Sequence, residues 1–473
     1  MNDITAIFAF LKYCLGYKRN MSRMIAGMDW QELYSFASKQ ALLGLSFEGI
    51  ERLGKEYSEE LRLNQIGREL LMTWMGKAQQ IRRQNMKVNA VASKLYSMLR
   101  EDGLRCCILK GQGNALIYPN AYSRNPGDID VWVNASRERI MEYAQKKFEL
   151  GDDIRLQHLE TSLDGVPVEL HFFPCTMNNP IYHARLQKWF RRNADLQCSH
   201  IVGLPDGAGD IAIPTTAFNV VYQLTHLYHH FFDEGIGMRQ IIDYYYVVCD
   251  FYKVYQNSSK ITPSLFFDKA SCTRQFESEL SLHSLASLFP LKEGSTSHPD
   301  PLTLRGEGGN RPTRCSEPLR SKDGGPSKVS PDCAGWDRLS IEGDNSAGST
   351  TVVTSYASTA LDVAQRELKY LGLWKFAGAV MYVLKEVLGL SEDKMIVPVD
   401  EKRGRLLLAE ILDGGNFGRH FSKYGGFTHQ SMGKKYFLKI WRNMHFVRYY
   451  PAEALCEPLF RTWHFFWRLK YKK

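Results

Sequence analysis

Two aspartates lie two positions apart in the short run DIDVWV, residues 128–133, which follows a polar, turn-rich passage. If this run is a β-strand, Asp128 and Asp130 share one face and the apolar residues occupy the other. Carboxylates at this spacing lie about 6–7 Å apart and repel by about 2–3 kcal/mol at an effective dielectric constant of 20. The pattern therefore predicts either a solvated pair or a pair held by a cation.

A second feature is the turn that leads to this strand. An apolar run at residues 106–109 stops at Lys110-Gly111, and Arg124 follows before Gly127 opens the aspartate run. Glycine lets backbone amides approach a phosphate, and lysine or arginine supplies compensating charge. Lys110, Gly111 and Arg124 are thus candidate phosphate contacts, although a Lys-Gly pair alone is equally typical of a surface turn.

These residues resemble the polymerase-β-type nucleotidyltransferase superfamily, which places an Asp-x-Asp pair on a strand after a glycine-containing turn. The closer likeness is to a bacterial group of uncharacterised nucleotidyltransferase-fold proteins. The matching residues are Lys110-Gly111, Tyr118-Pro119, Arg124 and Gly127-Asp128-Ile129-Asp130. The superfamily's usual Gly-Ser turn is here Gly111-Gln112, which lacks the hydroxyl that would contact a phosphate.

The resemblance implies an α+β fold, with a nucleotidyltransferase-like mixed-sheet lobe flanked by N- and C-terminal helical lobes. It also implies metal-dependent transfer of a nucleotidyl group from an NTP, such as ATP, to a hydroxyl acceptor in a protein, an RNA or a small molecule. Asp128, Asp130 and Glu169 would be the catalytic residues and would bind Mg²⁺ or Mn²⁺, because hard cations prefer carboxylate oxygens. Glu169 would also activate the acceptor hydroxyl.

Under the same resemblance, Lys110, Gly111 and Arg124 would bind the nucleotide. Two alternatives stay open. The three carboxylates could be solvated surface charges, or the fold could be catalytically degenerate and act as a binding or regulatory module. The intact aspartate pair favours an enzyme, whereas Gln112 favours the module.

Composition sets broad limits on the class of protein. A chain of 473 residues with 44% hydrophobic content can bury a large core, and its net charge of +9 suits an anionic substrate without requiring nucleic acid. The ten cysteines show no CxxC spacing, which is typical of reduced thiols in a cytoplasmic protein. The N-terminus has no signal-peptide pattern, and no run of about 18 apolar residues predicts a membrane span.

Changes of pattern along the chain predict five segments. They are an N-terminal helical cap (1–100), a nucleotidyltransferase-like catalytic lobe (101–210), a helical lobe (211–291), a disordered insertion (292–355) and a continued helical lobe with a basic aromatic tail (356–473). The insertion is predicted because Gly, Ser and Pro replace large apolar residues, so that little surface can be buried.

Local signals mark several elements within these segments. Asp29 and Ser136 can cap helices, and Thr215 or Thr216 can cap a third. Apolar periodicity from residue 59 to 100 is long for one helix, so a break near Gly76 is expected. Strands are predicted at 106–109, 154–159 and 166–172. Pro167 places the last at a sheet edge or at a strand start.

Two further regions carry candidate functional residues. His226 and His230 share a helix face and could bind a metal, but a buried polar network with Arg239 and Asp243 is the favoured interpretation. The absence of HExxH argues against a metalloprotease. The aromatic and basic segment 434–473 could bind a nucleic-acid backbone or a membrane surface. Packed aromatics with solvated cations are the commoner arrangement.

Overall fold

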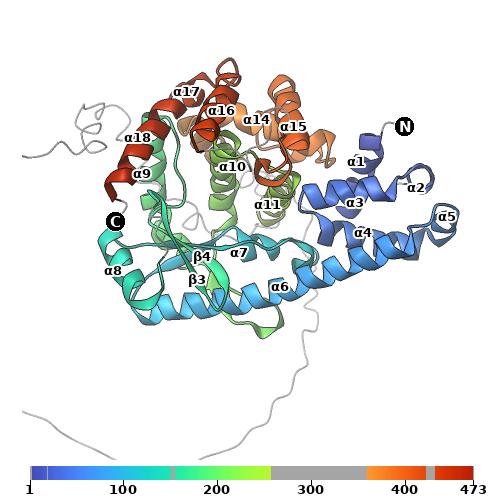
Figure 1. The fold of residues 1–473 in the computed structure, drawn as a ribbon, viewed down its shortest axis with the longest axis horizontal. Helices are drawn as coiled ribbons and strands as arrows, with labels where there is room; N and C mark the ends of the chain where they lie inside the picture. The colour runs from blue at the N-terminus through green and yellow to red at the C-terminus, as the bar shows by residue number, and fades with distance from the viewer. Residues whose placement is uncertain (1–2, 19, 151–154, 257–359, 422–431, 472–473) are drawn as a thin grey trace, which may run out of the picture. The chain divides into compact units, whose positions relative to one another are not determined.

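The computed structural model describes residues 3–18, 20–150, 155–256, 360–421 and 432–471 (Figure 1). Within them the chain is α+β, with a small mixed sheet preceded and followed by helices, as predicted. The insertion predicted at 292–355 lies outside the described residues.

The sheet has four strands in the order β1-β2-β4-β3. The strands of this sheet and of a separate hairpin are β1 (Cys106–Leu109), β2 (Ile129–Val133), β3 (His158–Leu163), β4 (Val166–His171), β5 (Ile201–Gly203) and β6 (Asp210–Ala212). β2 pairs antiparallel with β1 and parallel with β4, and β3 pairs antiparallel with β4. The central pair of strands therefore carries two of the three predicted carboxylates, Asp130 on β2 and Glu169 on β4, and Asp128 directly precedes β2.

Helices account for most of the remaining described structure. The α-helices are α1 (Asp3–Cys14), α2 (Ser22–Ala26), α3 (Trp30–Lys39), α4 (Leu43–Glu56), α5 (Ser58–Leu63), α6 (Arg68–Glu101), α7 (Gly111–Ala115), α8 (Arg137–Lys147), α9 (Pro180–Gln197), α10 (Thr216–Asp233), α11 (Met238–Gln256), α14 (Trp374–Glu386), α15 (Glu401–Gly414), α16 (Met432–Met444), α17 (Pro451–Ala454) and α18 (Glu457–Tyr471). Residues 360–370 are also helical, and short 3₁₀ turns are η1 (Ala121–Ser123), η2 (Pro205–Gly207), η4 (Glu392–Lys394) and η5 (Asn416–Gly418).

Two predicted helix caps are confirmed. Asp29 accepts hydrogen bonds from the backbone amides of Gln31 and Glu32, each at 2.9 Å, and Ser136 accepts one from Arg139 at 3.3 Å. Thr215 precedes α10, but its hydroxyl donates to Gln197 instead of capping the helix. A side-chain acceptor thus fixes the start of α3 and of α8.

The predicted break near Gly76 is wrong. α6 runs without interruption from Arg68 to Glu101, and the chain breaks earlier, between α5 and α6. Glycine in a helix interior costs only about 1 kcal/mol relative to alanine. Packing of the C-terminal half of α6 on the sheet stabilises the helix by more free energy than this cost, so the helix continues through Gly76.

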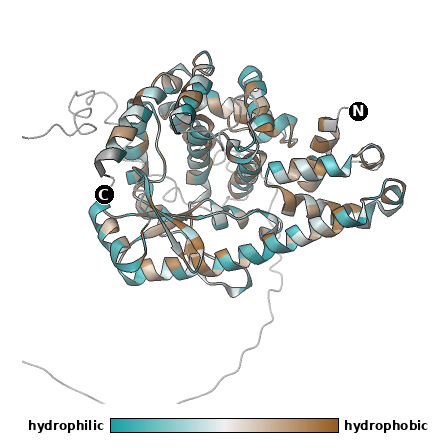
Figure 2. Ribbon diagram, in the orientation of Figure 1, coloured by the Kyte–Doolittle hydropathy of each residue, from teal (hydrophilic) through white to brown (hydrophobic). Residues whose placement is uncertain are grey.

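The two faces of the sheet are covered differently. Ile129, Val131 and Val133 point into a core shared with α6 and α8, and α6 follows the sheet along this side (Figure 1). On the opposite face Trp132 packs against Phe190 of α9 and Phe218 of α10. Hydrophobic and hydrophilic stretches alternate along α6 in Figure 2, as expected for a helix with one buried side. Asp130 shares the face of Trp132.

The β3–β4 hairpin corrects one expectation and decides another. β3 begins at His158, later than the predicted 154–159 strand. Pro167 is the second residue of β4, so the predicted strand start is confirmed, but β4 lies between β2 and β3 rather than at an edge. Its missing N–H is tolerated because the pairing with β2 begins only at Val168.

Two general features complete the description. None of the described helices is both long and apolar enough to cross a membrane. The cysteines in the described ranges are free thiols, most of them buried.

Candidate active site

The two central strands bring the predicted carboxylates together. Asp130 of β2 is the register partner of Glu169 of β4, and Leu109, the last residue of β1, is the partner of Asp130 on its other side. Lys110 follows directly after β1, so its side chain starts beside Asp130. Pairing of neighbouring strands therefore collects one cation and two carboxylates whose positions span about sixty residues of sequence.

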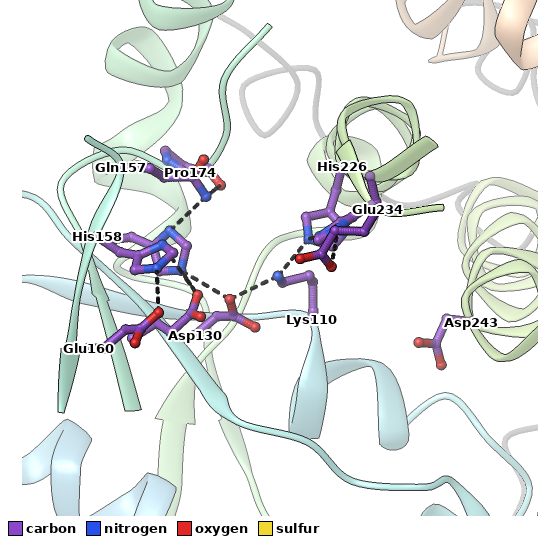
Figure 3. A network of polar contacts seen from close by, with 12 residues as sticks. Lys110, Asp130, Gln157, His158, Glu160, Pro174, His226, Glu234 and Asp243 are labelled. Carbon is purple, nitrogen blue, oxygen red and sulfur yellow. Dashed lines mark hydrogen bonds and ion pairs between the residues drawn. The ribbon is translucent and has the colours of Figure 1, made fainter. Parts of the chain in front are cut away.

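Asp130 is held by two cationic side chains (Figure 3). Its Oδ1 accepts a hydrogen bond from Lys110 Nζ at 2.8 Å and lies 3.0 Å from His171 Nε2. The same His171 nitrogen lies 3.1 Å from Glu169 Oε2. Because one imidazole nitrogen reaches both carboxylates, the oxygens of Asp130 and Glu169 converge on the same side of the sheet.

The ammonium of Lys110 also joins the sheet to α10. His226 Nε2 lies 2.7 Å from Lys110 Nζ and 2.9 Å from His230 Nε2. Burial and the neighbouring Lys110 hold the pKa of His226 far below its ordinary value. A neutral His226 can therefore accept a hydrogen bond from the lysine. The polar network predicted for this segment is present in part, since the histidines contact Lys110 whereas Arg239 and Asp243 bind Asn125 and Arg124.

The electrostatics of the carboxylates differ sharply. Burial alone would raise the pKa of Asp130, but Lys110 and His171 hold it well below its ordinary range. Burial likewise opposes the charge of His171, yet its bonds to Asp130 and Glu169 raise the pKa of His171 to about 9. For Asp128, repulsion from Asp130, followed by partial desolvation of the carboxyl group and by repulsion from Glu169, raises the pKa to about 6. Negative charge is thus in excess around Asp128.

A pocket lies where these residues meet the helical lobe. It is lined by Lys110, Gly111, Arg124, Gly127, Asp128, Asp130, Gln223, His226, Leu227, Arg239, Gln240, Asp243 and Phe417, and it holds about 460 Å³ of empty space counted to its opening. Both aspartates of the pair line it, and Asp128 is exposed to solvent. Glu169 is not among the residues that line the pocket, but it lies beside Asp130 in the sheet and shares His171 with it.

The backbone at Lys110 is strained. Its φ of 52° and ψ of −127° lie in a region that is favourable for glycine and not for residues with a side chain. Gly111 follows with a φ of 33°. This turn aims the Lys110 ammonium back at Asp130 and leaves Gly111 on the pocket wall.

Arg124 lies in the pocket wall, but its guanidinium is engaged. Nε and Nη2 donate to the two carboxylate oxygens of Asp243 at 2.8 and 2.9 Å, and the Tyr118 hydroxyl donates to the same carboxylate at 2.7 Å. Tyr118 and Arg124 both belong to the sequence pattern before the aspartates. Their shared partner on α11 shows that this pattern also joins the sheet to the helical lobe.

The guanidinium of Arg239, unlike that of Arg124, is only partly hydrogen-bonded. Its Nη1 donates to the carbonyl of Asn125 at 3.1 Å, its Nε is buried without a partner, and its guanidinium lies 5.4 Å from the ring centre of Phe417. Among the described residues, no carboxylate lies within 4.0 Å of this guanidinium. Burial lowers the pKa of Arg239. It is a cation at the pocket with unused hydrogen-bonding capacity.

Gln112 replaces the serine of the usual turn, and its side chain points away from the pocket. It is buried and donates to Asn89 of α6. Phosphate binding at this turn would therefore depend on backbone amides and Lys110, not on a side chain at position 112.

Sequence reasoning missed some residues of the site. His171 follows Glu169 by two positions on the same strand, a spacing that could have flagged it. His158 and Phe417 had no comparable local signal, because only strand pairing and the approach of η5 bring them near. The basic C-terminal segment is partly internal, since Arg442 is buried beside Glu410 and Arg461 pairs with Asp233.

Comparison with known protein families gives a match. A family described as uncharacterised nucleotidyltransferase matches residues 26–261, a range that holds every pocket residue except Phe417. No curated protein and no solved structure matches the chain.

Proposed function

Because this chain belongs, through residues 26–261, to the uncharacterised nucleotidyltransferase family, we propose that it transfers a nucleotidyl group from an NTP to a hydroxyl acceptor. The observation that carries the proposal is the convergence of Asp128, Asp130 and Lys110 on one pocket, with Glu169 beside them. In this reaction the acceptor oxygen bonds to the α-phosphorus, the bond from that phosphorus to the β-phosphate oxygen breaks, and pyrophosphate leaves.

The carboxylates fit a hard divalent cation. Asp130 and Glu169 are neighbours in the sheet, and the raised pKa of Asp128 reflects negative charge that the nearby side chains do not fully balance. We propose that Asp128, Asp130 and Glu169 bind Mg²⁺ or Mn²⁺. Such an ion, when bound, would stabilise charge developing on the phosphate oxygens.

The phosphates have a cationic wall to bind against. We assign Lys110 and Gly111 to the triphosphate, with Arg124 as a further contact in the same wall. The Arg124 fork is already occupied by Asp243, so Arg239, with its unpartnered Nε, is the stronger arginine contact. The ammonium of Lys110 has three N–H donors. Asp130 and the neutral His226 accept two of them, which leaves the third for a phosphate oxygen.

Glu169 is the proposed base for the acceptor hydroxyl. It is partly exposed, so a hydroxyl can approach it, and its partner His171 can hold the proton-accepting oxygen in place. The acceptor class is open among protein, RNA and small molecule. A nucleic-acid acceptor would bring in the exposed cations of the C-terminal segment, such as Arg448.

The alternative is a binding or regulatory module without catalysis. Its specific support is Gln112, which stands where the usual turn has a serine and therefore offers phosphate no hydroxyl. The Gln112 amide donates to Asn89 instead. Such a module would bind nucleotide through the same pocket and leave it intact. We propose the cytoplasm as the compartment, in keeping with the free thiols of the described residues.

The test is transfer of label. The purified full chain is incubated with each α-labelled NTP and Mg²⁺ or Mn²⁺, with and without cell extract, alongside Asp128→Asn and Asp130→Asn. We expect a labelled acceptor with the wild type and at least a hundredfold (about 3 kcal/mol) less with either variant. Binding without transfer under every condition would establish the module, and equal labelling by the variants would remove the aspartates from the reaction.

A further inference from the structure

A second cluster of metal-binding side chains lies on β3 and β4, beside the carboxylates. His158, Glu169 and His171 each offer one ligand atom, and these atoms lie within 4.8 Å of one another. His158 is the register partner of His171, and Glu169 precedes His171 by two positions, so all three side chains leave the same face of the hairpin. His158 is visible in Figure 3 close to the carboxylates around Asp130.

The separations within the cluster match those of a bound ion. Nδ1 of His158 lies 3.4 Å from Glu169 Oε2, and Nε2 of His171 lies 3.1 Å from the same oxygen. Ligand atoms about 2.0–2.1 Å from a tetrahedral zinc ion are about 3.3–3.4 Å apart. Two of the distances between ligand atoms are therefore already close to those that a tetrahedral zinc ion requires.

The absence of hydrogen bonds to the His158 ring, among the described residues, is an independent observation. His158 is only 6% exposed, and neither ring nitrogen has a hydrogen-bond partner among the described residues. Buried imidazole nitrogens are normally satisfied by a donor, an acceptor, water or a metal. A buried imidazole that makes no hydrogen bond within the described parts of the chain and lies 3.4 Å from Glu169 has a nitrogen lone pair available to bind a metal ion.

We infer that His158, Glu169 and His171 form a binding site for a divalent transition-metal ion, of which zinc fits best. Two imidazoles and one carboxylate form a nitrogen-rich set, which zinc accepts and magnesium or calcium does not prefer. The site shares Glu169 with the proposed Mg²⁺ position but does not depend on nucleotidyl transfer.

The test is zinc binding by the full chain in the absence of nucleotide. Protein freed of metal with EDTA is titrated with Zn²⁺ against a chromophoric chelator, with Mg²⁺ in excess throughout. His158→Phe and His171→Gln each remove a ligand, whereas Asp128→Asn alters the neighbouring carboxylate site. His226→Gln is the matched control, because it removes an equally buried histidine from the other histidine cluster.

We expect one zinc ion bound by the wild type. His158→Phe and His171→Gln should each weaken it by more than about a hundredfold, since even changes behind a ligand cost about 10–100-fold. Asp128→Asn and His226→Gln should bind zinc as the wild type does. In the metal-free state His158→Phe should melt no lower than the wild type, because the ring it replaces makes no hydrogen bond among the described residues. Zinc should raise the melting temperature of the wild type and leave that of His158→Phe unchanged.

Three results would overturn the inference. These are no zinc binding by the wild type, undiminished binding by His158→Phe, or loss of binding confined to His226→Gln or Asp128→Asn. A protein that binds zinc as described but transfers no nucleotide would refute the proposed reaction and leave this site in place.

Discussion

Asp130 and Asp243 are both buried aspartates paired with a cation, yet their surroundings differ in composition. Asp243 is a single carboxylate that receives the fork of Arg124 and the hydroxyl of Tyr118. Asp130 belongs to a group of three carboxylates, with Asp128 and Glu169, whose closest cations among the described residues are Lys110 and His171. The first cluster is satisfied by its own residues, and the second retains excess negative charge.

The difference separates a structural ion pair from a binding site. At Asp243 both carboxylate oxygens accept hydrogen bonds, from Arg124 and Tyr118, so the cluster joins the 118–124 turn to α11. At Asp130 the strained backbone of Lys110, the raised pKa of Asp128 and the unpartnered His158 occur together. Backbone strain, uncompensated charge and missing hydrogen bonds are concentrated at functional sites, because a bound ligand relieves them.

The largest expected effect is on the satisfied cluster. Asp243→Asn leaves the Arg124 guanidinium buried without a carboxylate, and should lower the free energy of unfolding by about 3–5 kcal/mol. Urea unfolding measures it. Asp195→Asn is the matched control, because it breaks the exposed pair with Arg105 and should cost less than about 1 kcal/mol. Similar stabilities for the two variants would mean that Arg124 is not held by Asp243.

The carboxylate cluster around Asp130 should make the free energy of unfolding depend on pH. The pKa of His171 rises from 6.5 to about 9 on folding, so its contribution is fully present below pH 6.5 and is lost as pH rises through 9. In EDTA, the wild type should lose about 3 kcal/mol of unfolding free energy from this group between those values, as judged from about 1.4 kcal/mol for each pKa unit. His171→Gln should lose much less over the same range. Parallel pH curves would show that His171 is neutral in the folded protein.

Asp128→Asn should stabilise the protein and damage its activity. Because folding raises the pKa of Asp128 from 3.8 to about 6, the stability tied to its protonated form is lost as pH rises through 6. Replacement should therefore add about 1 kcal/mol at pH 7 in EDTA, a value reduced for the solvent exposure of the side chain. The gain should vanish below about pH 4, where both proteins carry no charge at this position. A destabilised variant at neutral pH would show that the crowding of carboxylates is not costly.

The smallest effect concerns the backbone of Lys110. Lys110→Ala and Lys110→Gly both remove the ammonium, but only glycine adopts a φ of 52° with ψ of −127° without strain. We expect the glycine variant to be more stable than the alanine variant by roughly 0.5–1 kcal/mol. Thermal unfolding of the pair measures the difference. An alanine variant of equal or greater stability would show that this turn is not strained.

The sequence determined those features that depend on neighbours along the chain. The strand at 106–109, the alternation that separates Asp130 from Val131, and the caps at Asp29 and Ser136 all follow from periodicity or from a side chain within reach of its own backbone. The family was evident from the same short stretch, because its motif is contiguous.

Tertiary structure decided which of these residues act together. Arg124 pairs with Asp243 across more than a hundred residues, His158 reaches Glu169 only through the β3–β4 pairing, and Phe417 enters the pocket from η5. Likewise, α6 continues through Gly76 because its far half packs on the sheet. Such outcomes depend on long-range packing energies that exceed local propensities, and no local pattern in the chain records them.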